Sequence, residues 1–235
     1  MSNVVIQQKC IKRILLDLKN IDSKLLNSNN IYYSHDEDNI LKGYAMIIGP
    51  EDTVYDYGYY FFEFFFTSNY PFEPPIVKFK THDGITRFHP NLYRNGKVCL
   101  SILNTWRGES WSSCLTLTTI LLTLVTLFTK TPILSEPGID ESYKYFNNYH
   151  KIITYKNIDH SILYYLNPEH IENNFKIFFS VIEEKFKENR DKILNICKLK
   201  LKEKKKDKYI VDIYSMIQVI NYDNLIEKIN KIDIK

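Results

Sequence analysis

The stretch HPNLYRNGKVCLS, residues 89–101, contains a cysteine whose position suggests covalent chemistry. Catalytic cysteines usually take their thiolate from a histidine, a basic neighbour or a helix N-terminus. Asn95-Gly96 marks a turn, and the following KVCL indicates a short extended piece that offers Cys99 no adjacent base. His89 lies ten residues upstream, where it can fold back to assist the thiol or simply hold the turn. The segment therefore raises the question of which reaction a weakly activated thiol performs.

Composition indicates a globular protein with an aromatic core. The chain has 235 residues, of which 44% are hydrophobic and 14% aromatic, enough for one domain with a substantial extension. A net charge of +3 is too small to require a nucleic acid, so we expect no such partner. The first residues lack the pattern of a signal peptide, and no apolar run reaches the length of a membrane span. We therefore expect a soluble, intracellular protein without a membrane partner.

The cysteines are widely separated along the chain. They occur without a CxxC motif or the spacing of a zinc site, at Cys10, Cys99, Cys114 and Cys197. We therefore expect reduced thiols, no disulfide framework and no bound metal.

Hydrophobic periodicity predicts the elements that precede this segment. Residues 4–21 indicate an amphipathic helix with a basic outer face. Its apolar positions are Ile11, Ile14, Leu15, Leu18 and Ile21. Four strands joined by short turns follow between residues 31 and 80, which predicts an antiparallel meander. In the third strand, alternation assigns Phe62, Phe64 and Phe66 to the core and Phe61, Glu63 and Phe65 to the outside.

Other signals organise the rest of the chain. The prolines of NYPFEPP predict a rigid surface loop, and the stripe from Leu117 to Phe128 predicts a buried helix. Asn167-Pro168-Glu169 indicates a helix start, continued by an apolar stripe that runs to Phe186. Residues 209–214 suggest a strand or helix piece, and residues 224–232 a final helix.

Element order and motifs together resemble the ubiquitin-conjugating enzyme family. The matching motifs occur in the family's order and spacing: YPFEPP (70–75), HPN (89–91), NGKVCLSIL (95–103) and WS (111–112). The resemblance covers residues 5–165 and is greatest to larger members that bear a C-terminal extension. It implies an α/β (α+β) fold with an N-terminal helix, a four-stranded antiparallel meander, a buried central helix and C-terminal helices. We predict a catalytic core over residues 1–165 and a mainly helical extension over residues 166–235.

The resemblance assigns roles around the thiol. It implies that Cys99 accepts ubiquitin as a thioester and passes it to a lysine amine or a ligase. Such nearly balanced exchange requires no strongly acidic thiol, which explains the missing base. By resemblance, Asn91 supplies an oxyanion donor or holds the neighbouring loop, while His89 and Pro90 are structural. Glu136 is the nearest match to the acidic residue that orients the incoming lysine, and Asp140 is a second candidate.

The resemblance also implies partners and their docking residues. The basic face formed by Lys9, Lys12 and Arg13 matches the docking site for the ubiquitin-activating enzyme. Phe72, Trp111 and Ser112 lie on the two loops that meet ubiquitin ligases, and protein substrates complete the set of partners. Cys114 stands where most members have a proline. No cofactor is expected, because the activating enzyme uses the ATP.

Three alternatives stay open at this point. The chain could carry another ubiquitin-like modifier, or it could bind ubiquitin without conjugating it. It could also be a cysteine hydrolase that pairs Cys99 with a distant histidine such as His150 or His160.

Overall fold

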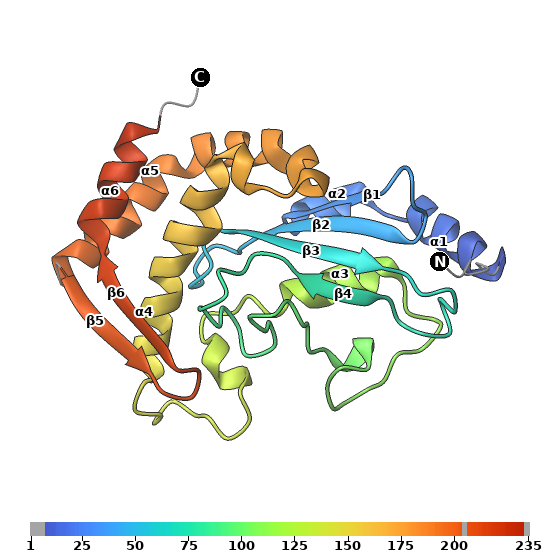
Figure 1. Cartoon of the computed structure of the whole chain (residues 1–235), viewed down its shortest axis with the longest axis horizontal. Helices are drawn as coiled ribbons and strands as arrows, with labels where there is room; N and C mark the ends of the chain where they lie inside the picture. The colour runs from blue at the N-terminus through green and yellow to red at the C-terminus, as the bar shows by residue number, and fades with distance from the viewer. Residues whose placement is uncertain (1–7, 204–205, 233–235) are drawn as a thin grey trace.

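The computed structural model describes residues 8–203 and 206–232, and a four-stranded antiparallel sheet lies at its centre (Figure 1). Helices α1 (Gln8–Lys19) and α2 (Ser23–Ser28) precede the sheet. The strands are neighbours in chain order, with the bounds β1 (Ile31–His35), β2 (Lys42–Ile48), β3 (Tyr59–Phe65) and β4 (Ile76–Phe79). The predicted meander is therefore confirmed.

One face of the sheet packs against helix α3 (Leu117–Val125). Thr116 caps this helix, since its side chain accepts a hydrogen bond from the Thr119 N–H at 3.2 Å. Phe62 and Phe64 of β3 are fully buried in the same hydrophobic cluster as the helix. The core face and the buried helix predicted from the sequence are confirmed.

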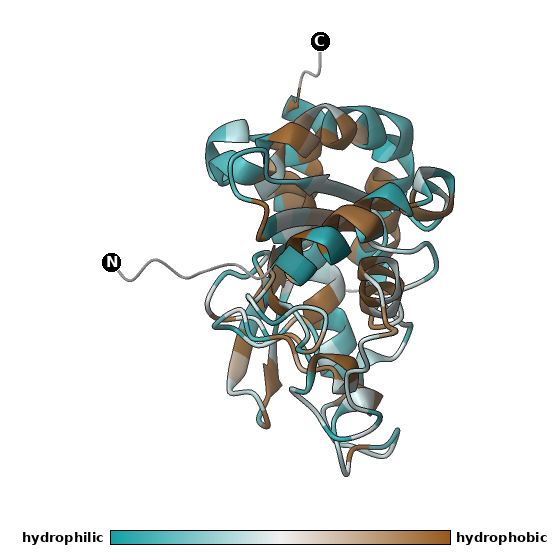
Figure 2. Ribbon diagram, turned by 90° about the vertical axis from the view of Figure 1, so that its right-hand side faces the viewer, coloured by the Kyte–Doolittle hydropathy of each residue, from teal (hydrophilic) through white to brown (hydrophobic). Residues whose placement is uncertain are grey.

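The opposite face of the sheet is also largely buried, which the sequence reasoning did not predict. Phe61, assigned to the outside, is 2% exposed, and its ring lies 4.9 Å from Tyr165 and 5.1 Å from Phe175 between centroids. Phe65 at the far end of the strand remains 40% exposed. Alternation separates two faces but does not say which face another element covers. Figure 2 shows hydrophobic residues on the elements both above and below the sheet.

The elements covering this second face follow helix α4 (Phe146–Lys156). The predicted helix start at Asn167 gives a single 3-10 turn, in which the Asn167 side chain accepts from the Glu169 N–H at 3.1 Å. The long helix α5 (Phe179–Glu203) begins ten residues after Glu169. Glu172 is extended, with φ −56° and ψ 141°, and interrupts the helix so that Phe175 can pack on the sheet. The prediction of one continuous helix was wrong.

A β-hairpin separates α5 from the last helix. Strands β5 (Lys206–Val211) and β6 (Met216–Asn221) pair antiparallel, and α6 (Tyr222–Lys231) follows them. The expected mainly helical extension thus contains a two-stranded sheet. The hairpin packs along α4, where the Asn148 side-chain amide donates to the Ile210 carbonyl at 3.0 Å. The predicted division of the chain at residues 165 and 166 stays a prediction. Val211 and Met216 of the hairpin pack into the same hydrophobic cluster as β3 and α3.

Short helical turns connect these elements. Their bounds are η1 (Ser101–Leu103), η2 (Pro132–Ser135), η3 (Asn157–Leu163, π-helical), η4 (Tyr164–Leu166), η5 (Pro168–His170) and η6 (Asn173–Phe178).

Helix α1 differs in detail from its predicted apolar face. Ile14 is buried at 1% exposure, but Leu15 is 52% exposed. Asp17 is buried instead, since its carboxylate accepts hydrogen bonds from the Tyr70 hydroxyl and from Arg13 Nε. The helix therefore docks partly through a polar network, which periodicity of apolar residues does not detect.

Candidate active site

Cys99 follows a turn that is hydrogen-bonded to the edge of the sheet. The Gly96 N–H donates to the Tyr93 carbonyl at 3.0 Å, and the Gly96 carbonyl accepts from the Phe79 N–H of β4 at 2.8 Å. Gly96 has φ +84°, and a Cβ there would lie 2.9 Å from the Phe79 carbonyl oxygen, so the turn requires glycine. The turn fixes the position of Cys99, which is 1% exposed.

Asn91 binds the Cys99 backbone on both sides. The Cys99 N–H donates to the Asn91 carbonyl at 2.9 Å, and the Asn91 side-chain amide donates to the Cys99 carbonyl at 2.7 Å. In this state one N–H of the amide holds the cysteine segment. A primary amide has a second N–H, which leaves a donor for a developing oxyanion.

His89 is placed as a structural residue and not as a base. Its Nδ1 accepts the Asn91 N–H at 2.9 Å, so the ring is neutral with its proton on Nε2. The residue is fully buried, and this burial, with the nearby Arg87 charge, lowers the pKa of His89 to about 3. A group of that basicity cannot take a proton from a thiol near neutral pH. Pro90, also buried, follows it in the same turn.

The other histidines considered as bases are occupied elsewhere. Burial lowers the pKa of His160 to about 4, and its ring stacks on Tyr164 at 4.8 Å between centroids. The ring of His150 packs edge-on against Phe146 at 4.5 Å. Among the described residues, no histidine forms a hydrogen bond with Cys99. The geometry thus lacks the base that a cysteine hydrolase needs.

Arg87 and Tyr93 flank the thiol segment, and the sequence reasoning did not single them out. Arg87 donates to the carbonyls of His89 at 3.2 Å and Pro90 at 2.6 Å, and its guanidinium lies 3.4 Å from the centroid of the Tyr93 ring. Burial and then the contact with the Cys99 thiol raise the pKa of Tyr93. The position of both residues next to HPN was the available signal, because side chains beside a catalytic turn often line the site.

Glu136 is linked to this cluster through the C-terminal hairpin. Tyr214, in the turn between β5 and β6, donates its hydroxyl proton to the Glu136 carboxylate at 2.6 Å. The Tyr214 ring centroid lies 5.4 Å from the Arg87 guanidinium. Asp140 is instead bound by Ser142, whose N–H and hydroxyl hydrogen bonds lower the pKa of that exposed carboxyl. Glu136 therefore contacts a tyrosine that lies beside Arg87, whereas Asp140 is bound by Ser142.

The three basic residues of α1 are not equivalent. Lys9 and Lys12 are exposed. Arg13 donates to the carbonyls of Ser113 and Leu115, each at 2.5 Å, and forms an ion pair with Asp17 at 2.9 Å. Its side chain is 17% exposed and connects α1 to the loop before α3. Arg13 is therefore a bridging residue within the chain, while the two lysines remain available to a partner.

The two loops expected to meet ligases lie next to each other. The Trp111 indole N–H donates to the Pro71 carbonyl at 2.7 Å and so joins the loops. Phe72, on the first of these loops, has 65% of its surface exposed. Ser112 is exposed, and so is Cys114. The pair of loops thus presents an aromatic side chain to solvent on a fixed base.

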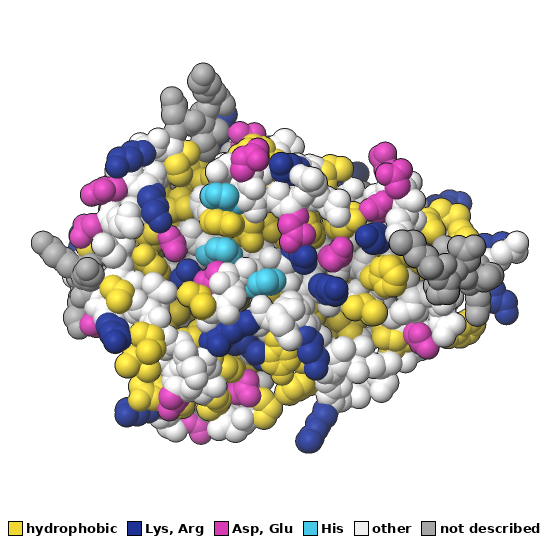
Figure 3. All heavy atoms as spheres, in the orientation of Figure 1, with side chains coloured by type: hydrophobic (Ala, Val, Ile, Leu, Met, Phe, Trp, Pro, Cys, Tyr) yellow, Lys and Arg dark blue, Asp and Glu magenta, His cyan; other side chains and the backbone are white. Residues whose placement is uncertain are grey.

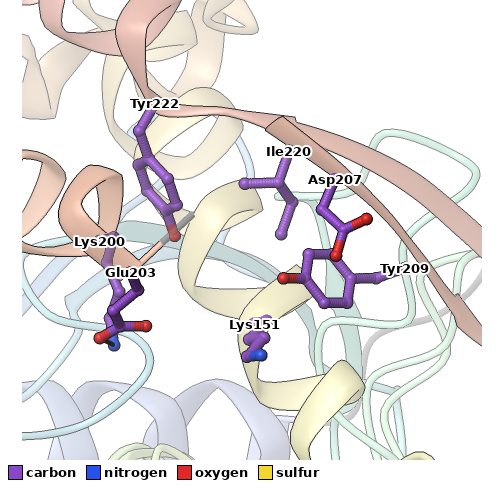
Figure 4. A pocket seen from close by; sticks show the side chains of 7 residues that line it. All are labelled: Lys151, Lys200, Glu203, Asp207, Tyr209, Ile220 and Tyr222. Atoms are coloured by element: carbon purple, nitrogen blue, oxygen red, sulfur yellow. Dashed lines mark hydrogen bonds and ion pairs between the residues drawn. The ribbon is translucent and has the colours of Figure 1, made fainter. Parts of the chain in front are cut away.

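A small cavity lies at the root of the hairpin, away from the thiol segment (Figure 4). Its volume of about 90 Å³ is lined by α4, α5, both hairpin strands and the start of α6. Lys151 of α4 and Tyr209 of β5 face each other there, with the ammonium 4.9 Å from the ring centroid. The described residues include no group of three or more His, Cys, Asp or Glu side chains arranged to hold a metal ion.

Fold and site together define a class of protein. The structure combines a meander sheet, a buried helix behind it, and a cysteine held by the HPN asparagine. Residues 13–158 match the family model of the ubiquitin-conjugating enzyme. This chain belongs to the ubiquitin-conjugating enzyme family. The resemblance predicted from the motifs is confirmed.

Particular relatives are larger proteins. Ubiquitin-conjugating enzyme E2 Z of Danio rerio is 34% identical over 197 residues, covering 83% of this chain and 59% of that relative. The probable ubiquitin-conjugating enzyme protein 17 of Caenorhabditis elegans is 38% identical over 196 residues, which are 78% of this chain and 26% of the relative. The chain thus spans between a quarter and three fifths of these relatives. Among the described residues, no helix is long and apolar enough to cross a membrane.

Proposed function

We propose that this chain accepts ubiquitin from an activating enzyme as a thioester on Cys99 and passes it to a lysine amine or a ligase. The observation that carries the proposal is the arrangement of Asn91 and Cys99, in which the thiol residue is fixed by two hydrogen bonds at 2.7 and 2.9 Å while His89 is kept neutral. Such a site suits a carrier that exchanges thioesters better than a hydrolase.

The reaction consists of two acyl transfers. In the first, the Cys99 thiolate attacks the thioester carbonyl of charged activating enzyme, and the activating enzyme's thiol leaves. In the second, a lysine amine attacks the new thioester, a C–N bond forms, the C–S bond breaks, and the Cys99 thiol is released. ATP is used by the activating enzyme, so the proposal requires no cofactor or metal on this chain.

Two side chains are assigned to the second transfer. The free N–H of the Asn91 amide stabilises the oxyanion of the tetrahedral intermediate, while its other N–H keeps the Cys99 carbonyl in place. Glu136 orients the incoming lysine amine, and the Tyr214 hydroxyl, 2.6 Å from its carboxylate, positions Glu136.

Partners follow from the exposed residues. Lys9 and Lys12 offer a basic helix face to the activating enzyme, and Phe72 with Trp111 offers an aromatic anchor to a ligase. All four cysteines are free thiols, and a thiol carrier needs them reduced. This supports an intracellular location.

A thioester assay tests the proposal. Protein is incubated with ubiquitin, activating enzyme and ATP, and the products are separated on non-reducing and reducing gels. Wild type is expected to give a reducible adduct, and Cys99→Ser an adduct that resists reductant, or none. Cys114→Ser, a change at an exposed thiol, serves as the matched control and should charge like wild type.

Three outcomes would count against the proposal. A reducible adduct that persists in Cys99→Ser would assign the thioester to another cysteine. Charging with a different ubiquitin-like modifier, but never with ubiquitin, would keep the chemistry and change the cargo. Binding of ubiquitin without any adduct would favour a non-conjugating module.

A further inference from the structure

The turn of the C-terminal hairpin and the segment before Cys99 line one open groove. Its volume is about 730 Å³. One wall is formed by Ile213, Tyr214 and Ser215 of the turn. The other is formed by Arg87, Tyr93, Arg94, Asn95 and Lys97. The C-terminal extension therefore supplies one wall of the groove, and the conjugating-enzyme core supplies the other.

The groove is basic. Its lining includes Arg87, Arg94 and Lys97, and the described residues that line it include no Asp or Glu. Lys97 is exposed, and Arg94 donates through Nη2 to the Tyr214 carbonyl while its buried Nε has no hydrogen-bond partner among the described residues. Figure 3 shows Lys and Arg side chains gathered in the lower middle of its face, beside the hairpin. Lys97 can therefore meet an anionic ligand directly, while Arg87 and Arg94, held by backbone carbonyls, add positive charge to the groove.

The groove runs beside the thiol segment. Tyr93 lines it, and burial together with the nearby Cys99 thiol raises the pKa of the Tyr93 hydroxyl, so the tyrosine links the groove to the surroundings of Cys99. Arg87 lies over the same ring at 3.4 Å. A polypeptide that presents a lysine to the thioester can therefore lie with its neighbouring residues in the groove.

We propose that this groove binds acidic side chains that flank the acceptor lysine of a protein substrate. The inference rests on the proposed function, since it names the substrate class of the same site. Charge complementarity selects the occupant, because the lining contains three cations, and the nearby Glu136 carboxylate is held by the Tyr214 hydroxyl outside that lining. An extended chain advances about 3.3 Å per residue, so acidic residues within about four positions lie within about 13 Å of the acceptor lysine.

The experiment compares two peptide acceptors with wild-type protein charged with ubiquitin. Each peptide has a single lysine, flanked by glutamates in one and by glutamines in the other. Discharge of the preformed thioester is followed in a single turnover. Exposed ion pairs predict a preference of about threefold to fivefold for the acidic peptide, which declines as salt is added.

Variants locate the preference in the groove. Arg94→Gln with Lys97→Gln should bring the ratio of the two discharge rates close to one. Lys97→Gln alone should lower the ratio in part, and this exposed residue can be changed without removing the Arg94 contact to the hairpin. Lys208→Gln, which removes an exposed charge on β5 outside the groove, is the matched control and should keep the wild-type ratio.

The outcomes separate the two proposals. A ratio of one for wild type, or an undiminished ratio in the double variant, would overturn the groove proposal while leaving the thioester intact. An equal loss of preference in Lys208→Gln would assign the effect to general charge and overturn it as well. Failure to form any thioester would instead overturn the proposed function, and it is visible before a peptide is added.

Discussion

Replacing Tyr214 by phenylalanine tests the contact between the extension and the active site. The change removes one oxygen, which donates to the Glu136 carboxylate at 2.6 Å, and keeps the ring beside Arg87 and Tyr149. Charging of Cys99 should be unaffected, because its hydrogen bonds to Asn91 do not involve the hairpin. Transfer to lysine should slow, because Glu136 loses the group that fixes its orientation.

The magnitude follows from the type of bond. A hydrogen bond to an ionised group contributes about 1.5–3 kcal/mol, and both partners here are partly exposed, which favours the lower end. If about 1 kcal/mol of this is expressed in the transition state, transfer slows about fivefold. In a Glu136→Gln background the same change should add little, since two residues that act through one contact are not additive.

The assay is single-turnover discharge of preformed thioester onto free lysine. Tyr143→Phe is the control, because it removes the same oxygen from a tyrosine that contacts Asp212 in the same hairpin turn and does not touch Glu136. The reasoning would be refuted by a wild-type discharge rate in Tyr214→Phe. Equal slowing in Tyr143→Phe would show that docking of the hairpin, and not the bond to Glu136, sets the rate.

Two further predictions concern stability. Phe61→Ala should lower the free energy of unfolding by about 3–4 kcal/mol, whereas Phe65→Ala, at a side chain that is 40% exposed, should lower it by less than about 1 kcal/mol. Similar urea midpoints for the two variants would contradict the burial of Phe61 beneath the extension. Burial alone would raise the pKa of Asp83, but hydrogen bonds from Thr86 and the Lys156 ion pair at 3.0 Å hold it at about 2. Because that folded-state pKa lies below the unfolded value, Asp83→Asn should lower the free energy of unfolding by about 2 kcal/mol near pH 7. Measured by urea unfolding, this loss relative to wild type should shrink as the pH falls from 4 towards 2. A loss that does not change with pH would show that the ionised carboxylate is not its cause.

Local sequence patterns predicted the four-stranded sheet and the helix packed behind it. The alternation in β3 and the apolar stripe from Leu117 predicted the sheet and the buried helix, because both depend on residues two to four positions apart. The family resemblance carried by the HPN motif assigned Asn91 to the site of Cys99, and the two residues, eight positions apart, are hydrogen-bonded in the structure. Contacts between residues that are close in the sequence can be predicted from the sequence alone.

Contacts between distant segments were not readable in this way. Arg13 was predicted to face a partner, but its hydrogen bonds go to carbonyls about one hundred residues away. The interruption at Glu172 was missed for a related reason, since a good cap at Asn167 favours a helix locally while burial of Phe175 against the sheet decides the backbone.

By itself, the sequence determined the family and the meander, and it singled out Cys99 as the candidate nucleophile, because these depend on motifs and periodicities within short stretches. The tertiary structure alone decided that the extension covers the second face of the sheet and that Tyr214 reaches Glu136 across 78 positions of the chain. The physical reason is that docking depends on the fit of whole surfaces formed by packed elements. No local pattern records which surface an element will cover.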